Sequence, residues 1–180
     1  MAKEKDKAYQ MYLTALDMEK TGENFYEKTS KSAKQAKNEL GEKLFRMLAD
    51  DELVHMKRIH AIYAALKKGS KFPRQWEKME IKHPDIIRVF QKLAENNKDK
   101  IKPSSTDLDA LDVGIGLENL SINYYQDRLE RSQIDIERDF LAQMVVEEKT
   151  HLRLLSDMKL YMTNPESWYI EHEKHGLDGV

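Results

Sequence analysis

Apolar residues recur every three or four positions along four stretches of the chain, which is the spacing of one face of an α-helix. In the first stretch, for example, Tyr12, Leu16 and Tyr26 fall on the same face. The pattern therefore predicts four long amphipathic helices. They cover about residues 7–36, about 42–69, from about 106 onward, and about 135–162.

The connections between these predicted helices differ in length. The turns near residues 38–41 and before residue 135 are short, whereas a crossover of about residues 69–106 separates the second helix from the third. Prolines interrupt the crossover, although residues 84–97 have the pattern of a short helix. Two short connections and one long one predict two antiparallel helical hairpins, which is the connectivity of ferritin-like four-helix bundles.

Length and composition agree with a single all-α domain. The chain has 180 residues, enough for one sizeable core, and only four prolines and seven glycines. Alanine, leucine, lysine, glutamate and methionine recur throughout, and these residues favour helices. We assign residues 1–163 to the bundle and residues 164–180 to a less regular C-terminal tail.

Charge and hydropathy argue against several classes of function. The formal net charge of −2 provides no basic excess for nucleic acid or anionic lipid. No stretch approaches the roughly 20 apolar residues of a membrane helix, so we expect a cytoplasmic protein. The absence of cysteine excludes disulfides, thiol nucleophiles and cysteine-held metal from this sequence.

The two predicted hairpins resemble each other in sequence. Residues 15–28 align with residues 114–127, and residues 47–55 align with residues 143–151. The alignment matches one glutamate with another in the first helix of each hairpin, and a Glu-x-x-His pair with another in the second helix. The six matched residues are Glu19, Glu52, His55, Glu118, Glu148 and His151.

These six residues predict a site for two metal ions. Each Glu-x-x-His pair places a carboxylate and an imidazole on one helix face, where both reach one point. Two such pairs with one glutamate on each remaining helix form the ligand set of di-iron and di-manganese bundles. Four carboxylates balance two divalent ions, and oxygen and nitrogen donors suit iron or manganese, with zinc also accepted. We expect Glu52 and Glu148 to bridge the ions, and Glu19 and Glu118 to bind as terminal ligands.

The alignment also selects among neighbouring residues. Glu23 aligns with Ile122, which favours Glu19 as the ligand, and Glu147 aligns with Asp51, which leaves Glu148 as the motif carboxylate. Asp51 and Glu147 each precede a ligand histidine by four residues; they either orient a ligand or are solvated acidic residues.

Two tyrosines and two glycines lie near the predicted ligands. Tyr26 and Tyr125 each follow a ligand glutamate by seven residues, so each phenol either hydrogen-bonds a ligand carboxylate or packs at the edge of the bundle. Gly22 and Gly114 lie inside helices, where glycine costs about 1 kcal/mol relative to alanine. Close approach of two helices is the favoured explanation, and room for metal and oxidant is the alternative.

The sequence DMEKTGENFYEK (17–28), the two Glu-x-x-His helices and LENLSINYY (117–125) resemble the rubrerythrin-like branch of the ferritin-like superfamily. The resemblance extends over all four helices. It implies a non-haem di-iron centre that reacts with peroxide or dioxygen, with the six matched residues at the ligand positions of the family.

This sequence departs from the rubrerythrin pattern in two places. Full rubrerythrins carry a rubredoxin-type iron domain with four cysteines, and this cysteine-free chain implies that another protein donates electrons. Many also carry a further carboxylate one turn after the third-helix ligand, where this sequence has Ser121. The resemblance therefore supports a di-iron centre more strongly than it supports efficient peroxidase activity. We expect the protein to form a homodimer.

The sequence supports one leading function and two alternatives. The leading hypothesis is a di-iron oxidoreductase acting on peroxide or dioxygen. The first alternative is an iron-binding or ferroxidase protein without a peroxidase role, and the second is a metal-free helical interaction module. Metal content and oligomeric state distinguish the three.

Overall fold

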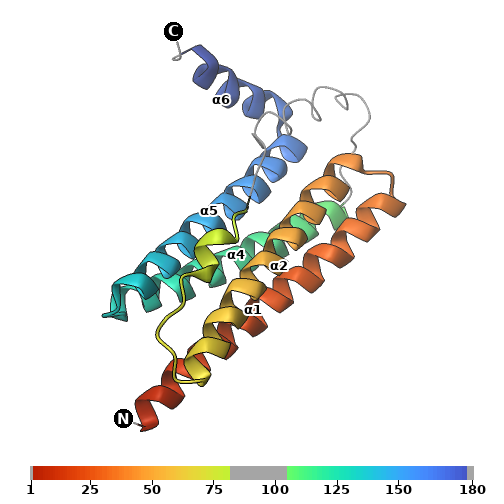
Figure 1. Cartoon of the computed structure of the whole chain (residues 1–180). Coiled ribbons are helices and arrows are strands. Elements are labelled where there is room, and N and C mark those ends of the chain that lie inside the picture. The colour runs from red at the N-terminus through yellow and green to blue at the C-terminus, as the bar shows by residue number, and fades with distance from the viewer. Residues whose placement is uncertain (1, 82–104, 178–180) are drawn as a thin grey trace.

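The computed structural model describes residues 2–81 and 105–177, most of which are helical (Figure 1). The short helix predicted at residues 84–97 lies outside the described residues. The described elements are α1 (Ala2–Gln35), α2 (Glu39–Lys67), the 3₁₀ helix η1 (Gln75–Lys78), α4 (Ser105–Arg131), α5 (Asp135–Thr163) and α6 (Pro165–Leu177).

Short turns join α1 to α2 and α4 to α5, so that each pair forms an antiparallel hairpin (Figure 1). Between α1 and α2 the chain reverses at Lys37, which has a positive φ of 59°. Oδ1 of Asn38 then caps α2 by accepting the backbone N–H of Gly41 at 2.9 Å. The all-α bundle of two antiparallel hairpins predicted from the sequence is thereby confirmed.

The core consists of two apolar clusters, one toward each end of the bundle. The α6-side cluster includes Tyr26, Leu155 and Trp168, and the η1-side cluster includes Tyr12 and Trp76. On each of the four long helices, the predicted ligand positions lie between a residue of one cluster and a residue of the other. Among the described helices, none combines the length and apolar character needed to cross a membrane.

Residues after Pro165, expected to be less regular, form α6. Proline is compatible with the first turn of a helix because its missing N–H needs no partner there. Oδ1 of Asn164 caps the helix by accepting the backbone N–H of Ser167 at 3.1 Å. Trp168 is 1 % exposed and packs edge-on against Tyr161 with ring centroids 5.4 Å apart. This segment therefore closes the α6-side cluster.

Two glycines of α4 have different surroundings. A Cβ atom on Gly114 would lie 3.2 Å from Cδ1 of Leu155 and 3.3 Å from Cε1 of Tyr26, both of which are fully buried. A Cβ atom on Gly116 would meet no atom within 4 Å. Close packing against α5 and α1 therefore accounts for Gly114, as the sequence analysis favoured.

We predict opposite effects for the same substitution at these two positions. Gly116→Ala should stabilise the protein by up to about 1 kcal/mol because alanine favours the helix. Gly114→Ala should destabilise it by about 1–3 kcal/mol because the added methyl overpacks the core. Urea denaturation of both variants measures the difference. Equal stabilisation by both substitutions would show that α4 does not need the close approach.

Candidate metal centre

A layer of polar side chains crosses the bundle between the two apolar clusters. Helices α1 and α4 contribute one glutamate each, and α2 and α5 contribute a Glu-x-x-His pair each. Every one of these residues is at most 3 % exposed. The structure brings together all six residues that the sequence analysis selected, namely Glu19, Glu52, His55, Glu118, Glu148 and His151.

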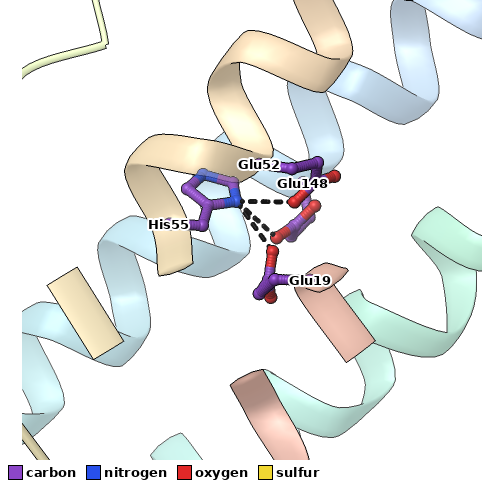
Figure 2. Close-up of side chains that lie close together, drawn as sticks. All are labelled: Glu19, Glu52, His55 and Glu148. Atoms are coloured by element: carbon purple, nitrogen blue, oxygen red, sulfur yellow. Dashed lines mark hydrogen bonds and ion pairs between the residues drawn. The ribbon is translucent and has the colours of Figure 1, made fainter. Parts of the chain in front are cut away.

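The six side chains form two groups of four that share Glu52 and Glu148. Within each group, one donor atom per residue lies within 4.8 Å of the others. Glu19 and His55 complete one group, here called the His55 half of the centre (Figure 2). Glu118 and the second histidine complete the His151 half. Two shared carboxylates and two unshared ones are the arrangement expected of bridging and terminal ligands, and their assignment as ligands remains a prediction.

The donor atoms of the His55 half are closely gathered. Nδ1 of His55 lies 3.0 Å from Oε2 of Glu19 and 3.2 Å from Oε2 of Glu52. The same nitrogen lies 3.3 Å from Oε1 of Glu148. Figure 2 shows these three carboxylates, which come from three different helices, converging on one nitrogen of the imidazole ring. One metal ion could contact all four side chains.

The His151 half is wider. Nδ1 of His151 lies 3.5 Å from Oε2 of Glu148 and 3.6 Å from Oε2 of Glu118. Its distance to Oε1 of Glu52 is 3.8 Å. The two imidazole rings stack with centroids 5.5 Å apart, which holds the two halves side by side. The centre is therefore twofold in outline but unequal in its spacing.

Each histidine uses its other ring nitrogen to contact a carboxylate of the opposite hairpin. Nε2 of His55 lies 3.0 Å from Oε2 of Glu147, and Nε2 of His151 lies 3.2 Å from Oδ2 of Asp51. Because an ionised carboxylate only accepts, the ring N–H donates, and Nδ1 faces the ligand carboxylates. Asp51 and Glu147 thus orient a histidine, but not the one on their own helix.

Sequence reasoning missed Arg58, which is 0 % exposed and lies one turn after His55 on α2. Its Nη1 lies 2.5 Å from Oε2 of Glu147, and its Nε donates to the backbone carbonyl of Met79 at 2.8 Å. Nη2 donates to the same carbonyl. A charged residue on the apolar face of a helix was the available signal, since a buried arginine requires a partner.

The two tyrosines exchange hydrogen bonds between the hairpins. The phenol of Tyr26 on α1 donates to Oε1 of Glu118 on α4, and the phenol of Tyr125 on α4 donates to Oε1 of Glu19 on α1. Burial, followed by the adjacent carboxylate, raises the pKa of both phenols far above the usual range. Both phenols therefore remain protonated and act as donors to carboxylates that the sequence analysis assigned to terminal positions.

Gly22 leaves room for one of the shared carboxylates. A Cβ atom at this position would lie 3.2 Å from Oε1 of Glu52. The side chain of Glu52 on α2 therefore packs directly against α1 at Gly22, which agrees with the close approach of helices that the sequence analysis favoured, and the side chain that the glycine admits is a predicted ligand.

Comparison with known protein families identifies the chain. The family described as Rubrerythrin matches residues 12–159. The chain belongs to the rubrerythrin family. The matched residues include most of each of the four long helices and every side chain of the polar layer. The same comparisons find no significant match among curated proteins and none among solved structures.

The charges of this rubrerythrin-family centre are strongly coupled. Burial lowers the pKa of a histidine, but neighbouring carboxylates raise the pKa values of His55 and His151 well above the usual range. The main contribution comes from Glu148 for His55 and from Glu118 for His151. Burial raises the pKa of Glu118 to about 7 even though His151 opposes the shift. Despite its own burial, Glu148 has a lowered pKa because the charge of His55 favours its ionised form. The protein thus offsets its buried negative charge by binding protons.

The residues present fit the pair of iron ions that the family implies. Oε2 of Glu118 and both oxygens of Glu148 are buried and receive no hydrogen bond from any described residue. Buried oxygens without donors are costly unless a cation binds them. With each Nε2–H directed at Asp51 or Glu147, the Nδ1 atoms complete a donor set of oxygen and nitrogen without sulfur.

We predict that protein stripped of metal with a chelator loses stability as the pH rises from about 5 to 8. The raised pKa values of Glu118, His55 and His151 mean that the folded state binds more protons than the unfolded state in this window. Each group contributes at most about 1.4 kcal/mol per pH unit. The lowered pKa values of Glu147 and Glu148 affect stability only below the ordinary glutamate pKa of 4.5. Urea denaturation across this range measures the slope.

Metal-loaded protein provides the matched comparison for this pH series. Metal competes with protons for the same imidazole and carboxylate atoms, so the stabilisation by added metal should increase with pH. If the stability of the stripped protein instead rises between about pH 5 and pH 8, the folded state does not bind the additional protons that we assign to the buried groups.

Proposed function

We propose that this rubrerythrin-family protein is a non-haem di-iron oxidoreductase that reduces peroxide or dioxygen. The observation that carries the proposal is the pair of donor groups that share Glu52 and Glu148. Shared carboxylates hold two ions close enough to act on one small molecule. The ligand set of two Glu-x-x-His pairs and two further glutamates is that of di-iron bundles.

Charge supports the binding of two divalent ions. The four carboxylates of the layer carry four negative charges when ionised, and two neutral imidazoles carry none. Two divalent ions restore neutrality without the protons that the cluster otherwise binds. The nearby acid Glu147 does not alter this balance because Arg58 pairs with it at 2.5 Å. Two ions of charge +2 therefore match the site, whereas a single ion leaves it negative.

The surrounding residues hold the proposed ligands in place. Tyr125 donates to one oxygen of Glu19, and Tyr26 donates to one oxygen of Glu118. The second oxygen of each carboxylate is directed at a histidine. When bound, two ferrous ions supply two electrons, the number needed to reduce one peroxide to water. The chain's own part is to orient the ligands and to shield them between two apolar clusters.

The partners of the reaction follow from this chemistry. Peroxide or dioxygen is small enough to react at a site whose side chains are almost fully buried. Return to the ferrous state needs an electron donor, and we propose a separate protein because this sequence has no cysteine to hold a second iron centre. We propose a cytoplasmic homodimer as the functional form.

Iron oxidation for storage is the principal competing function. It uses similar ligands, but a storage protein needs a hollow assembly to receive the oxidised iron. A dimer in solution would argue against storage, and a large hollow oligomer would favour it. Light scattering of the iron-loaded protein separates the two functions.

We predict that protein reconstituted anaerobically with ferrous iron binds about two ions per chain and is oxidised by stoichiometric hydrogen peroxide. Glu52→Gln should abolish both properties because Glu52 belongs to both donor groups. Elemental analysis measures the iron content, and near-ultraviolet absorption of ferric iron follows the oxidation.

Glu23→Gln is the matched control because Glu23 lies one turn after Glu19 on α1 but belongs to neither donor group. Its iron content and oxidation should equal those of the wild type. Wild-type protein that binds two irons but does not react with peroxide or dioxygen would disprove the oxidoreductase, and protein that binds no metal would disprove the centre.

A further inference from the structure

The internal repeat fails at one buried position beside the centre. In the register that matches His55 with His151, Arg58 on α2 matches Leu154 on α5. Both side chains are buried, at 0 % and 4 % exposed. One half of the centre therefore has a cation three residues after its histidine, and the other half has a leucine of the α6-side cluster.

Arg58 is held from two sides. Its Nε and Nη2 both donate to the carbonyl of Met79, the residue that follows η1. Three residues before Met79, Trp76 anchors η1 in the core, where it is 3 % exposed and packs against Phe140 with ring centroids 5.4 Å apart. The guanidinium is thus fixed by the start of the crossover, and its remaining arm, Nη1, contacts Glu147.

The contact with Arg58 continues to His55. Oε2 of Glu147 receives both the guanidinium at 2.5 Å and Nε2 of His55 at 3.0 Å. Oε1 of Glu147 accepts the side-chain amide of Gln143 at 2.9 Å. With both oxygens held, Glu147 fixes the orientation of the ring and directs Nδ1 of His55 at the ligand carboxylates.

We propose that Arg58 is a positioning residue that makes the His55 half the tighter of two unequal metal-binding halves. This inference rests on the proposed di-metal centre. The shorter spacing supports it, because Nδ1 of His55 lies 3.0–3.3 Å from its three carboxylates. The corresponding distances from His151 are 3.5–3.8 Å.

The charge of Arg58 does not oppose metal binding at this half. Arg58 and Glu147 form a pair with no net charge, and the imidazole of His55 lies between that pair and the ligand carboxylates. The ring therefore gains a fixed orientation without added repulsion between the guanidinium and a metal ion. Loss of such an outer hydrogen-bonding partner typically costs about 10–100-fold in metal affinity.

Anaerobic titration with Co²⁺, followed by visible absorption, tests the proposal. The test compares two single-half proteins: His151→Ala, which retains His55, and His55→Ala, which retains His151. Adding Arg58→Leu, which copies the residue of the other half, should weaken Co²⁺ binding about 10–100-fold in His151→Ala. It should leave binding by His55→Ala unchanged. An arginine that only stabilises the fold would affect both proteins equally.

The matched control is Arg46→Leu, which removes the same charge from the same helix at an exposed position paired with Asp50. It should leave both titrations unchanged. If Arg58→Leu does not fold, Arg58→Lys takes its place, since a single ammonium cannot hold Met79 and Glu147 in the planar geometry of guanidinium. Arg58→Lys should then show a smaller loss confined to the His55 half.

The outcomes separate this inference from the proposed function. If wild-type protein binds Co²⁺ but neither Arg58 variant weakens the His55 half selectively, the inference is wrong while the metal centre stands. If wild-type protein binds no Co²⁺, the centre and the inference both fail. If the Arg58 effect is found but the iron-loaded protein reacts with neither peroxide nor dioxygen, only the oxidoreductase fails.

Discussion

Four buried carboxylates at one level of a helical bundle require positive charge, and the rest of the structure is arranged around that requirement. Apolar clusters lie on both sides of the layer, so water cannot solvate the carboxylates. Phenols and imidazoles supply some of the donors, yet both oxygens of Glu148 receive none from the described residues. A bound cation is the compensation that this chemistry favours, and protons are the weaker substitute.

The same polar layer joins the two hairpins. Helices pack more extensively within a hairpin than between the hairpins, and several of the side-chain hydrogen bonds that cross between the hairpins lie at the centre. Tyr26 of the first hairpin donates to Glu118 of the second, and Tyr125 donates back to Glu19. The carboxylates beside the ligands likewise reach across to the opposite histidine. Assembly of the bundle therefore also assembles the donor set, so a metal ion bound there would stabilise the bundle.

The ends of the bundle depart from the symmetry of its middle. Trp76 of η1 closes one cluster, and Trp168 of α6 closes the other, so two unrelated segments complete a repeated core. The η1 end reaches the centre itself, through the carbonyl of Met79 and the guanidinium of Arg58. A symmetric ligand set thus acquires asymmetric support, which allows two chemically similar positions to differ in affinity.

The sequence alone predicted the four long helices, the two hairpins and the six residues that meet in the polar layer, because helical spacing is local and the repeat compares two copies of one pattern. It could not determine which histidine each acid orients, since Glu147 is near His151 in sequence but contacts His55 across the bundle. Nor could it place Arg58, whose partners come from η1 and α5. Such pairings depend on how separate helices are rotated and packed, and only the tertiary structure decides that.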